Sequence, residues 1–412
     1  MRERERERTN QPQLRFQGFE DEWKLKNLID VVDFKNSKSY EKQMKDHGKF
    51  ELVKMGSLDI ESNFKHSGNF IDESDEVLKK DDLFMIMASP PPGNLLGRVG
   101  LIPESNKFVL NTHTLLLIPK IESQRFFLWA YLNAKQFYFK KNALGMGAKH
   151  MSLLTRNNFP LYIPPKGIEE KLGLLFNLLS QNKKTKNSFL DSVNRLKQAL
   201  LTKLFINNNS SLPNFRFKGF YDFWQTKQLG DISERVREKN KELKYTETLT
   251  CSASAGLVLQ KDYFSKSISN INNIDSYYVV EKGDFVYNPT ISNLSPAGTI
   301  RINNLGIDGI ASPLYFVFKV FKKETRSFLS SFFFSKIWNK YILETGVTGV
   351  RATIINIGVE DMFKLPISIP SLEEQDKIGK LSKTLDKLIN LQNKEINILK
   401  ELKKTAMKMM LI

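Results

Sequence analysis

The sequence has few of the residues from which metal sites and covalent cross-links are built. Its 412 residues include one cysteine, Cys251, and four histidines. A single cysteine excludes a disulfide framework and the cysteine-based zinc modules. No two histidines stand at a spacing typical of metal ligands, so we expect no metal site. A lone thiol beside Ser252 is more often an inert buried group than a nucleophile.

Long apolar runs and targeting segments are also missing. Leu115–Ile118 and Phe332–Phe334 fall far short of the roughly 20 residues that a membrane span requires. The N-terminus alternates arginine and glutamate and contains no apolar core of a signal peptide. We therefore expect a cytoplasmic protein without membrane contact. Residues 1–12 are expected to form a charged tail, because such a stretch buries no apolar surface.

The common catalytic motifs are absent as well. No phosphate-binding loop, dinucleotide-binding glycine motif or nucleophile elbow occurs in the sequence. Asn288-Pro289-Thr290-Ile291 is only faintly similar to the Asn/Asp-Pro-Pro-aromatic motif of amino-methyltransferases, and no glycine-rich cofactor-binding strand end precedes it. A turn that closes an expected strand at Asp284–Tyr287 explains it without chemistry. We expect no catalytic residue in this chain.

Positive charge is what the sequence has in excess. Sixty-two Lys and Arg residues stand against 45 Asp and Glu residues, which gives a formal net charge of +17. A charge of this size and sign indicates a polyanionic partner, most commonly nucleic acid.

The chain also contains an internal repeat. Leu14-Arg15-Phe16-Gln17-Gly18-Phe19-Glu20-Asp21-Glu22-Trp23 returns 201 residues later as Phe215-Arg216-Phe217-Lys218-Gly219-Phe220-Tyr221-Asp222-Phe223-Trp224. Gly97–Ile102 has a looser echo at Gly298–Asn303, again offset by 201, and Phe159–Pro164 matches Leu365–Pro370 at an offset of 206. Leu196–Ile206 matches Leu402–Ile412 at the same offset of 206. Because a solenoid repeats every 20–50 residues, this pattern indicates one duplicated large unit instead.

Each copy follows the same plan, a mixed α/β domain and then a long helix. Strands are expected at Val109–Ile118, Tyr277–Val280 and Leu314–Val320, and helices at Gln124–Lys141 and Thr325–Leu343. A proline-marked strand exit and an acidic pair, Glu169-Glu170 or Glu373-Glu374, precede each long helix. The predicted segments are a tail (1–12), a first mixed domain (13–167), a helix (168–206), a linker (207–213), a second mixed domain (214–371) and a helix (372–412).

Both long helices carry an apolar seam at alternating spacings of three and four residues. The predicted seams are Leu172, Leu175, Leu179, Phe189, Val193, Leu196 and Leu200 in the first, and Ile378, Leu381, Leu385, Leu388, Leu399, Leu402, Ala406 and Met409 in the second. Polar residues interrupt each seam midway. Each seam extends about 50 Å at 1.5 Å per residue, longer than a small domain is wide. We therefore expect the helices to pair as a coiled coil rather than to pack only on their own domains.

Basic residues beside small residues in loop-like stretches are the candidate nucleic-acid contacts. In the first mixed domain they are Lys54, Lys65, His66, Arg98, Lys149 and His150. In the second they are Arg235, Arg237, Lys239, Lys261, Lys266, Arg301 and Arg351. Any one of them taken alone is more simply explained as a solvated charge. Lys149, His150 and Arg351 are the strongest single candidates, since the glycine-containing segments that hold them lie in register in the two copies.

The repeat resembles the DNA-specificity subunit of type I restriction–modification systems. The resemblance rests on the opening Arg-Phe-x-Gly-Phe-x-Asp-x-Trp motif, on Gly283–Pro289, and on the Pro-x-x-Ile-Pro strand exit followed by two glutamates. It extends from about Gln13 to Ile412. The first copy departs from the middle motif, where it reads Asp81-Asp82-Leu83-Phe84-Met85-Ile86.

The resemblance implies an α+β fold with two homologous α/β target-recognition domains, separated by two long helices in an antiparallel coiled coil with an internal pseudo-two-fold repeat. Each domain would read one half of a bipartite site in double-stranded DNA, and the helices would set the spacing. The implied partners are two modification subunits and ATP-dependent restriction subunits. S-adenosylmethionine, ATP and Mg²⁺ would bind to those partners and not to this chain. Apolar residues outside the seam would dock the modification subunits, namely Phe176, Leu178, Ile389 and Ile396.

Two alternatives remain open from the sequence. One is a stand-alone DNA adenine methyltransferase that uses Asn288-Pro289, and the other is a coiled-coil scaffold that binds DNA only non-specifically. The residues do not reveal the DNA target, because base readout depends on the placement of side chains.

Overall fold

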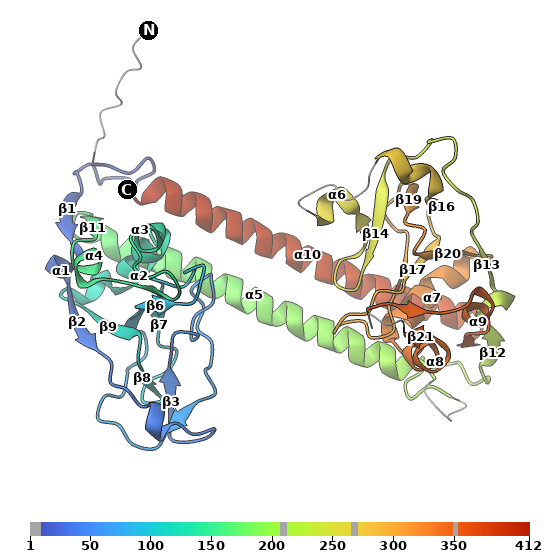
Figure 1. The fold of residues 1–412 in the computed structure, drawn as a ribbon, viewed down its shortest axis with the longest axis horizontal. Coiled ribbons are helices and arrows are strands. Elements are labelled where there is room, and N and C mark those ends of the chain that lie inside the picture. Colours follow the sequence, from blue (N-terminus) through green and yellow to red (C-terminus); the bar gives the residue numbers. More distant parts are fainter. Residues whose placement is uncertain (1–9, 207–211, 265–270, 349–352) are drawn as a thin grey trace, which may run out of the picture. The chain divides into compact units, whose positions relative to one another are not determined.

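The chain divides into two compact units, each built around one mixed domain. The structure, a computed structural model, describes residues 10–206, 212–264, 271–348 and 353–412. Unit 1 comprises Met1–Asn187 and Lys394–Ile412, and unit 2 comprises Ser188–Asn393. The helices α5 (Ile168–Leu204) and α10 (Leu372–Met410) each contribute one segment to each unit (Figure 1). Much of the predicted tail and of the predicted linker lies outside the described residues.

Unit 1 is organised around two small sheets. The first is antiparallel, with the order β2 (Val32–Asn36), β9 (Thr114–Pro119), β5 (Leu83–Ile86), β7 (Val99–Leu101). The second has the order β4 (Phe70–Ile71), β3 (Phe50–Val53), β8 (Phe108–Leu110), in which β3 and β8 are parallel. The strands β1 (Lys24–Asn27) with β11 (Pro160–Ile163), and β6 (Ala88–Ser89) with β10 (Lys149–His150), form two further pairs. The short helices are α1 (Leu28–Val31), η1 (Glu41–Gln43), η2 (Glu122–Gln124), α2 (Arg125–Ala134), α3 (Phe137–Lys141) and α4 (Leu153–Asn157).

Unit 2 repeats this arrangement. Its antiparallel sheet has the order β13 (Ser233–Arg235), β20 (Phe316–Val320), β17 (Phe285–Asn288), β18 (Thr299–Ile302). Its second sheet has the order β15 (Gly256–Leu259), β14 (Thr248–Ser252), β19 (Gly309–Ala311), β16 (Tyr278–Val280). Two pairs are β12 (Gln225–Gln228) with β23 (Pro366–Ile369), and β21 (Val347–Thr348) with β22 (Ile355–Asn356). The helices are η3 (Leu229–Asp231), α6 (Gln260–Tyr263), η4 (Ile271–Ser276), α7 (Lys323–Ser335), α8 (Asn339–Thr345) and α9 (Val359–Phe363).

The strand registers confirm the repeat at the level of single residues. Lys24 pairs with Ile163 in unit 1, and Gln225 pairs with Ile369 in unit 2. These partners are offset by 201 and 206, which are the offsets between the repeated sequence motifs. The predicted fold class, α+β with two homologous domains and two long helices, is confirmed.

Each unit buries segments of both long helices in its main core. In unit 1 the core includes Leu172 and Phe176 from α5, and Met410 and Leu411 from the end of α10 and just beyond it. In unit 2 it includes Leu201 from α5 and Ile378 from α10, with residues from the first sheet and α7. The helices are therefore structural parts of both units and not only connectors.

The starts of the long helices follow the sequence signals. Pro164 and Pro165 end β11, and Gly167 adopts a φ of +92° that a residue with a side chain rarely adopts. Glu169 and Glu170 then lie in the first turn of α5, where carboxylates stabilise the positive end of the helix dipole.

Three expected elements are interrupted. The helix expected over Gln124–Lys141 is divided into α2 and α3, and the helix expected over Thr325–Leu343 into α7 and α8. Lys336, with φ at +66°, ends α7 in the left-handed conformation. The strand expected over Val109–Ile118 is divided into β8 and β9 around His113, whose φ is +65°.

The helices α5 and α10 pair side by side in opposite directions (Figure 1). In unit 1, Lys403 Nζ donates to Ser180 Oγ at 2.7 Å and Lys186 Nζ lies 2.5 Å from Glu395 Oε2. Residue numbers therefore fall along α10 as they rise along α5, which is the antiparallel direction. Lys186 and Glu395 each interrupt an apolar seam in the sequence, and the structure shows that these interruptions pair with each other.

The predicted seam is wrong in detail beyond its interruptions. Phe189, Leu196 and Leu402 are exposed by 47%, 53% and 51%. The neighbouring positions turn inward instead, so that the buried Lys197 and the half-buried Lys403 take the places expected for Leu196 and Leu402. Lysine was excluded from the predicted seam because of its charge, although its long alkyl stem covers apolar surface while its amine reaches a polar partner.

Candidate nucleic-acid interface

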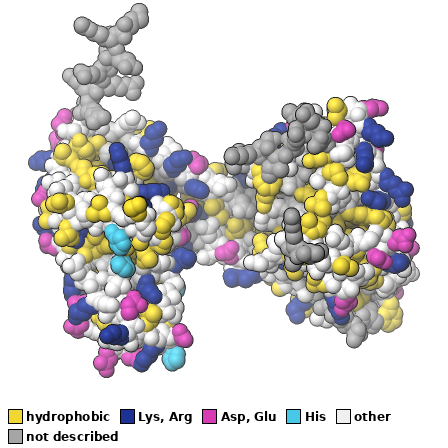
Figure 2. Space-filling view, in the orientation of Figure 1, with side chains coloured by type: hydrophobic (Ala, Val, Ile, Leu, Met, Phe, Trp, Pro, Cys, Tyr) yellow, Lys and Arg dark blue, Asp and Glu magenta, His cyan; other side chains and the backbone are white. Residues whose placement is uncertain are grey.

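Charged side chains are distributed over the surfaces of both units. Figure 2 shows Lys and Arg side chains scattered over the face in view, among Asp and Glu side chains. Because no single patch stands out on this face, the candidate contacts are judged by the support that each side chain receives.

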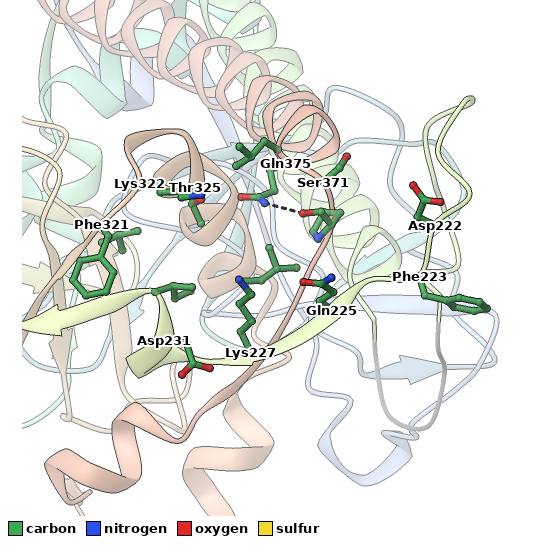
Figure 3. A pocket seen from close by; sticks show the side chains of 15 residues that line it. Asp222, Phe223, Gln225, Lys227, Asp231, Phe321, Lys322, Thr325, Ser371 and Gln375 are labelled. Atoms are coloured by element: carbon green, nitrogen blue, oxygen red, sulfur yellow. Dashed lines mark hydrogen bonds between the residues drawn. The ribbon is translucent and has the colours of Figure 1, made fainter.

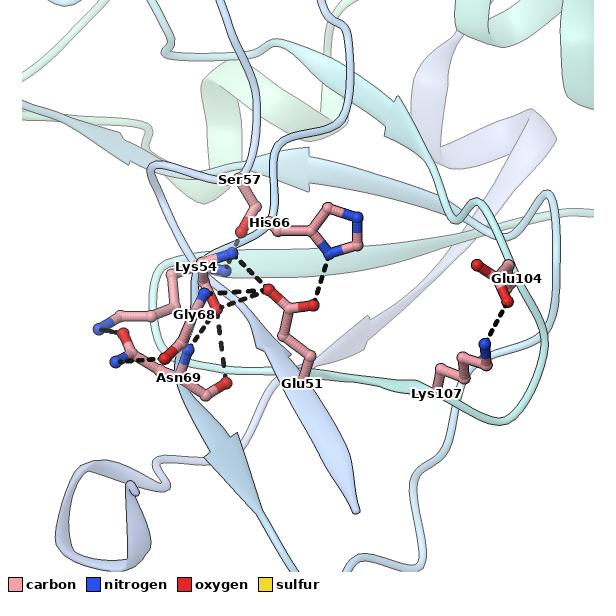
Figure 4. Close-up of polar contacts among 9 residues, drawn as sticks. Glu51, Lys54, Ser57, His66, Gly68, Asn69, Glu104 and Lys107 are labelled. Carbon is pink, nitrogen blue, oxygen red and sulfur yellow. Dashed lines mark hydrogen bonds and ion pairs between the residues drawn. The ribbon is translucent and has the colours of Figure 1, made fainter. Parts of the chain in front are cut away.

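In unit 1 a buried glutamate organises one group of candidates (Figure 4). Glu51 on β3 has a side chain that is 8% exposed, and its Oε2 lies 2.6 Å from His66 Nδ1. Its Oε1 accepts hydrogen bonds from the backbone N–H groups of Ser67 at 2.5 Å and Gly68 at 3.0 Å. The carboxylate therefore fixes the loop that carries His66, whose own side chain is 70% exposed.

Two predicted lysines lie near this loop. Lys54 Nζ donates to Asn69 Oδ1 at 3.0 Å (Figure 4). Lys65 is exposed one residue before His66. Lys54, Lys65 and His66 thus present donors from one stretch of unit 1 with a supported backbone.

Lys149, His150 and Arg98 form the second group of unit 1. Lys149 and His150 lie on the short strand β10, and Lys149 Nζ donates to the carbonyl of Gly145 at 2.6 Å. Gly93 lies so close to this strand that a Cβ there would be 3.0 Å from Lys149 Cγ, which places the 90–98 segment beside it. Arg98 ends that segment, and burial lowers the pKa of its guanidinium, although the group remains cationic at neutral pH.

In unit 2 the candidates follow β13. Arg235 lies over the rings of Tyr278 and Phe316 at 5.9 and 5.6 Å, and Lys239 lies 5.8 Å from the Tyr278 ring. Arg237 is exposed between them. Lys261 is 61% exposed and its Nζ lies 2.7 Å from Glu247 Oε1. Arg235, Arg237 and Lys239 therefore form a short basic row supported by aromatic rings.

Several candidates do not lie in loops as predicted. Lys149, His150, Arg235 and Arg301 are strand residues, and Lys261 lies in α6. Arg301 on β18 directs its guanidinium inward, where it donates to the carbonyls of Ile300 at 2.8 Å and Ala253 at 3.1 Å. Burial lowers its pKa, so its role in this structure is to satisfy buried carbonyls. Lys266 and Arg351 lie outside the described residues.

The predicted partner-docking residues differ in exposure. Phe176 is fully buried in the core of unit 1, so the expectation that its side chain is available to a partner is wrong. Leu178 is 53% exposed, and Ile389 and Ile396 are half-buried. For these three residues docking stays a prediction.

The residues that could have carried chemistry have structural roles. Asn288 Nδ2 donates to the carbonyl of Cys251 at 2.8 Å, and its Oδ1 accepts from the N–H of Thr290 at 3.0 Å. Burial raises the pKa of the Cys251 thiol to about 12, which keeps it in its unreactive protonated form. Within the described parts of the chain, no three His, Cys, Asp or Glu side chains group as metal ligands, and no helix is long and apolar enough to span a membrane.

A cavity in unit 2 adjoins a long helix and is balanced in charge. The cavity of about 540 Å³ in unit 2 lies at the start of α10 (Figure 3). Its wall includes Lys227 and Lys322, but also Asp222 and Asp231, and Gln375 Nε2 donates to the carbonyl of Pro370 at 2.8 Å. Because the cations are matched by carboxylates, nothing in its wall favours a polyanion.

The second cavity, in unit 1, was missed by the sequence reasoning. It measures about 580 Å³, and we call it the α10 pocket. Its lining is Glu61, Asn63, Arg98, Asn133, Ala134, Lys135, Ser180, Lys183, Lys400, Lys403, Lys404, Met407, Lys408 and Leu411. Only Arg98 was among the predicted contacts. The excess of lysine over acidic residues along both long helices is the sequence signal that could have led to the others.

Comparisons with known proteins decide the family. The family model "Type I restriction modification DNA specificity domain" matches the chain twice, over residues 20–204 and 201–401. This chain belongs to that family. Its match to two copies of the domain agrees with the two units of the structure.

Two relatives come from Methanocaldococcus jannaschii. The chain is 22% identical to the type I restriction enzyme MjaVIII specificity subunit over 304 residues, 69% of each chain. It is 22% identical to the putative type I restriction enzyme MjaX specificity subunit over 426 residues, 95% of this chain and 93% of that protein. Among solved structures, the type I restriction–modification S subunit from M. genitalium aligns with a TM-score of 0.65 at 14% identity, and the alignment covers 98% and 99% of the two chains.

The specificity family is a family of DNA sequence-recognition subunits without catalytic activity of their own, and catalysis resides in partner subunits. This assignment does not favour the stand-alone methyltransferase or the non-specific scaffold. The Asn288 carboxamide is already bonded to the backbone of Cys251 and Thr290, which agrees with a chain that has no methyltransferase site there.

Proposed function

We propose that each recognition unit of this specificity subunit reads one half of a bipartite site in double-stranded DNA. The observation that carries the proposal is the duplication itself, since two homologous units present different basic side chains on equivalent frameworks. Residues 13–167 and 214–371 are the proposed target-recognition domains, and 168–206 and 372–412 the helices that set the spacing. In unit 1 the contacts are Lys54, Lys65, His66, Arg98, Lys149 and His150. In unit 2 they are Arg235, Arg237, Lys239, Lys261, Lys266 and Arg351, whereas the inward orientation of Arg301 argues against a direct contact.

The chain would act with two modification subunits, which bind S-adenosylmethionine and methylate adenine, and with restriction subunits that consume ATP. Leu178, Ile389 and Ile396 are the proposed docking residues on the long helices. All three are apolar. Leu178 is exposed, whereas Ile389 and Ile396 are half-buried, and all three lie on helices that also contribute to the cores of the two units. No cofactor is assigned to this chain.

Mapping of methylated adenines tests the proposal. Cells that co-express a modification subunit with this chain are compared with cells that lack the chain. We expect methylation at a motif of two short defined halves around an undefined gap. Methylation at one continuous motif, or the same methylation without this chain, would contradict the proposal.

The role of the helices has its own test. One heptad is inserted into α5 and one at the equivalent point of α10, which lengthens the paired helices by about 10 Å at 1.5 Å per residue. At 3.4 Å per base pair this corresponds to about three base pairs. We expect unchanged half-sites with a longer gap, whereas an unchanged gap would exclude helix length as the determinant of spacing.

A further inference from the structure

The α10 pocket has a large excess of positive charge. Seven cationic side chains line it, and Glu61 is the one carboxylate among its lining residues. Glu61 is already shared, because its Oε2 lies 2.5 Å from Lys183 Nζ and its Oε1 lies 3.9 Å from Lys400 Nζ. Outside the lining, Glu401 lies 3.9 Å from Lys404. The pocket therefore holds more cations than its own carboxylates neutralise.

Three of these cations are partly removed from water. Burial, together with the neighbouring Lys183 and Arg98, lowers the pKa of Lys403 to about 8, against the opposite effect of Glu61. Burial also lowers the pKa values of Lys135 and Arg98. Placing several cations together away from water is unfavourable unless an anion joins them. A bound anion would relieve this repulsion.

The internal repeat shows that the fold does not require this charge. At an offset of 206, the helix positions of Lys183, Lys400, Lys404 and Lys408 correspond in unit 2 to Ile389, Asn194, Gln198 and Thr202. Two pocket lysines keep a lysine at the equivalent position of unit 2, namely Lys403 (Lys197, offset 206) and Lys135 (Lys336, offset 201). The same helices thus pack in unit 2 without four of the pocket's lysines, so these four lysines are specific to unit 1.

The lining favours phosphate groups as the ligand. Lysine acts on phosphate as a point charge, and such contacts position a nucleic acid without reading its bases. Lys400 to Lys408 extend along about 12 Å of α10, which corresponds to three or four phosphates of one strand at 3.4 Å each. The loop that supplies Glu61 and Asn63 continues into Lys65 and His66, two of the proposed DNA contacts.

We propose that the α10 pocket binds backbone phosphates of the DNA and anchors the duplex at unit 1 independently of base sequence. The inference rests on the proposed function, and it adds an asymmetry that the duplicated recognition units do not have by themselves. Unit 1 holds the duplex by its backbone as well as by its recognition surface, whereas unit 2 lacks four of the equivalent lysines.

The chain itself supplies the substitutions for a test. The pocket variant, Lys183→Ile, Lys400→Asn, Lys404→Gln and Lys408→Thr, introduces the residues that unit 2 has at the equivalent positions. The control variant, Lys184→Gln, Lys383→Gln, Lys387→Gln and Lys394→Gln, removes the same charge from exposed positions of the same helices outside the pocket. Both are purified with co-expressed modification subunits, and binding to target and non-target duplexes is measured by fluorescence anisotropy over a series of KCl concentrations.

We expect the slope of log affinity against log salt to fall by about 2 to 4 in the pocket variant for both duplexes, at about 0.9 per phosphate contact. The ratio of target to non-target affinity should stay unchanged, and the control variant should keep the wild-type slope. An unchanged slope in the pocket variant, or an equal loss in the control, would overturn the proposal. Loss of co-purified modification subunits with an unchanged slope would assign the pocket to an acidic protein segment instead.

Two further results separate the possible failures. Tripolyphosphate is titrated into the wild-type complex by calorimetry in the absence of DNA; pocket-dependent binding with an unchanged DNA salt slope would assign the pocket to a free polyphosphate and refute the DNA anchor. If the wild-type complex does not distinguish target from non-target duplex, the proposed function itself fails. If the wild-type complex distinguishes the two duplexes and the pocket variant has the same salt slope as the wild type, only the pocket inference fails.

Discussion

The repeated opening motif meets the long helix differently in the two copies, and this difference yields a quantitative prediction. In unit 2, Arg216 binds Glu374 through two hydrogen bonds, Nε to Oε1 at 2.9 Å and Nη2 to Oε2 at 2.8 Å. Trp224 Nε1 donates to the same Oε2 at 3.2 Å. In unit 1, the position of Glu374 is occupied by Ile168 at an offset of 206, and Arg15 donates to Gln11 instead.

The expected cost depends on which partner is removed. The side chain of Glu374 is 1% exposed, whereas that of Arg216 is 15% exposed. Arg216→Met leaves a buried carboxylate with Trp224 as its remaining partner, and breaking a buried pair in this way costs about 3–5 kcal/mol. Glu374→Gln leaves an arginine that still reaches water, so we expect a smaller loss of about 1.5–3 kcal/mol. At about 2–4 °C per kcal/mol for a unit of this size, Arg216→Met should lower the melting temperature by about 6–20 °C.

The first copy provides the matched control. The double variant Arg216→Met with Glu374→Ile introduces an apolar pair and should cost only about 1–2 kcal/mol, since Trp224 loses its acceptor but no charge stays buried. Arg15→Met, in the exposed equivalent, should change stability by less than about 0.5 kcal/mol. Urea unfolding of the full chain, followed by tryptophan fluorescence, measures all four variants. A double variant at least as unstable as Arg216→Met alone, or Arg15→Met as costly as Arg216→Met, would refute the reasoning.

Three further predictions concern single features. Burial raises the pKa of Asp284 to about 6, so the stability of the protein should fall as pH rises from about 4 through 6. Asp284→Asn should remove this dependence and stabilise the protein at pH 7 by up to about 3 kcal/mol. A pH series of urea unfolding that is identical for the wild type and the variant would contradict this prediction. Burial lowers the pKa of Lys403 to about 8, so stability should rise with pH from about 8 to 10.5, and Lys403→Met should raise stability at pH 7 and flatten that rise in the same assay. Leu178→Asp together with Ile389→Asp should abolish co-purification of the modification subunit while the circular dichroism spectrum stays unchanged, and normal co-purification would remove both residues from the docking surface.

The sequence was sufficient for the features that are written twice. The shared offsets of 201 and 206 predicted two homologous domains, and the same offsets recur in the β1–β11 and β12–β23 registers. The proline exits and acidic pairs placed the starts of both long helices, because capping signals are local. Strand and helix interruptions were missed where single residues such as Lys336 adopt a left-handed conformation that residue type alone does not indicate.

Side-chain direction was the harder part of the prediction. Placing Leu196 and Leu402 in the seam rather than Lys197 and Lys403 follows hydrophobicity. At these two points the structure instead packs the lysine stems inward, and their amines bond to Asp386 and Ser180. Arg301 was predicted to face solvent, whereas two backbone carbonyls hold it inside. Both errors arise because tertiary partners, far away in the sequence, decide where a long basic side chain points.

The repeat also provides a way to separate structural from functional charge in this chain. A basic residue that both copies keep at an equivalent position, such as Lys197 and Lys403, has a packing role in both units, and each amine bonds to the opposite helix. A basic residue that only one copy keeps, such as Lys400 or Lys408, is not required by a framework that folds without it in the other copy. The net charge of +17 therefore has two components with different causes. We propose that the component that differs between the copies is the one that contacts the DNA.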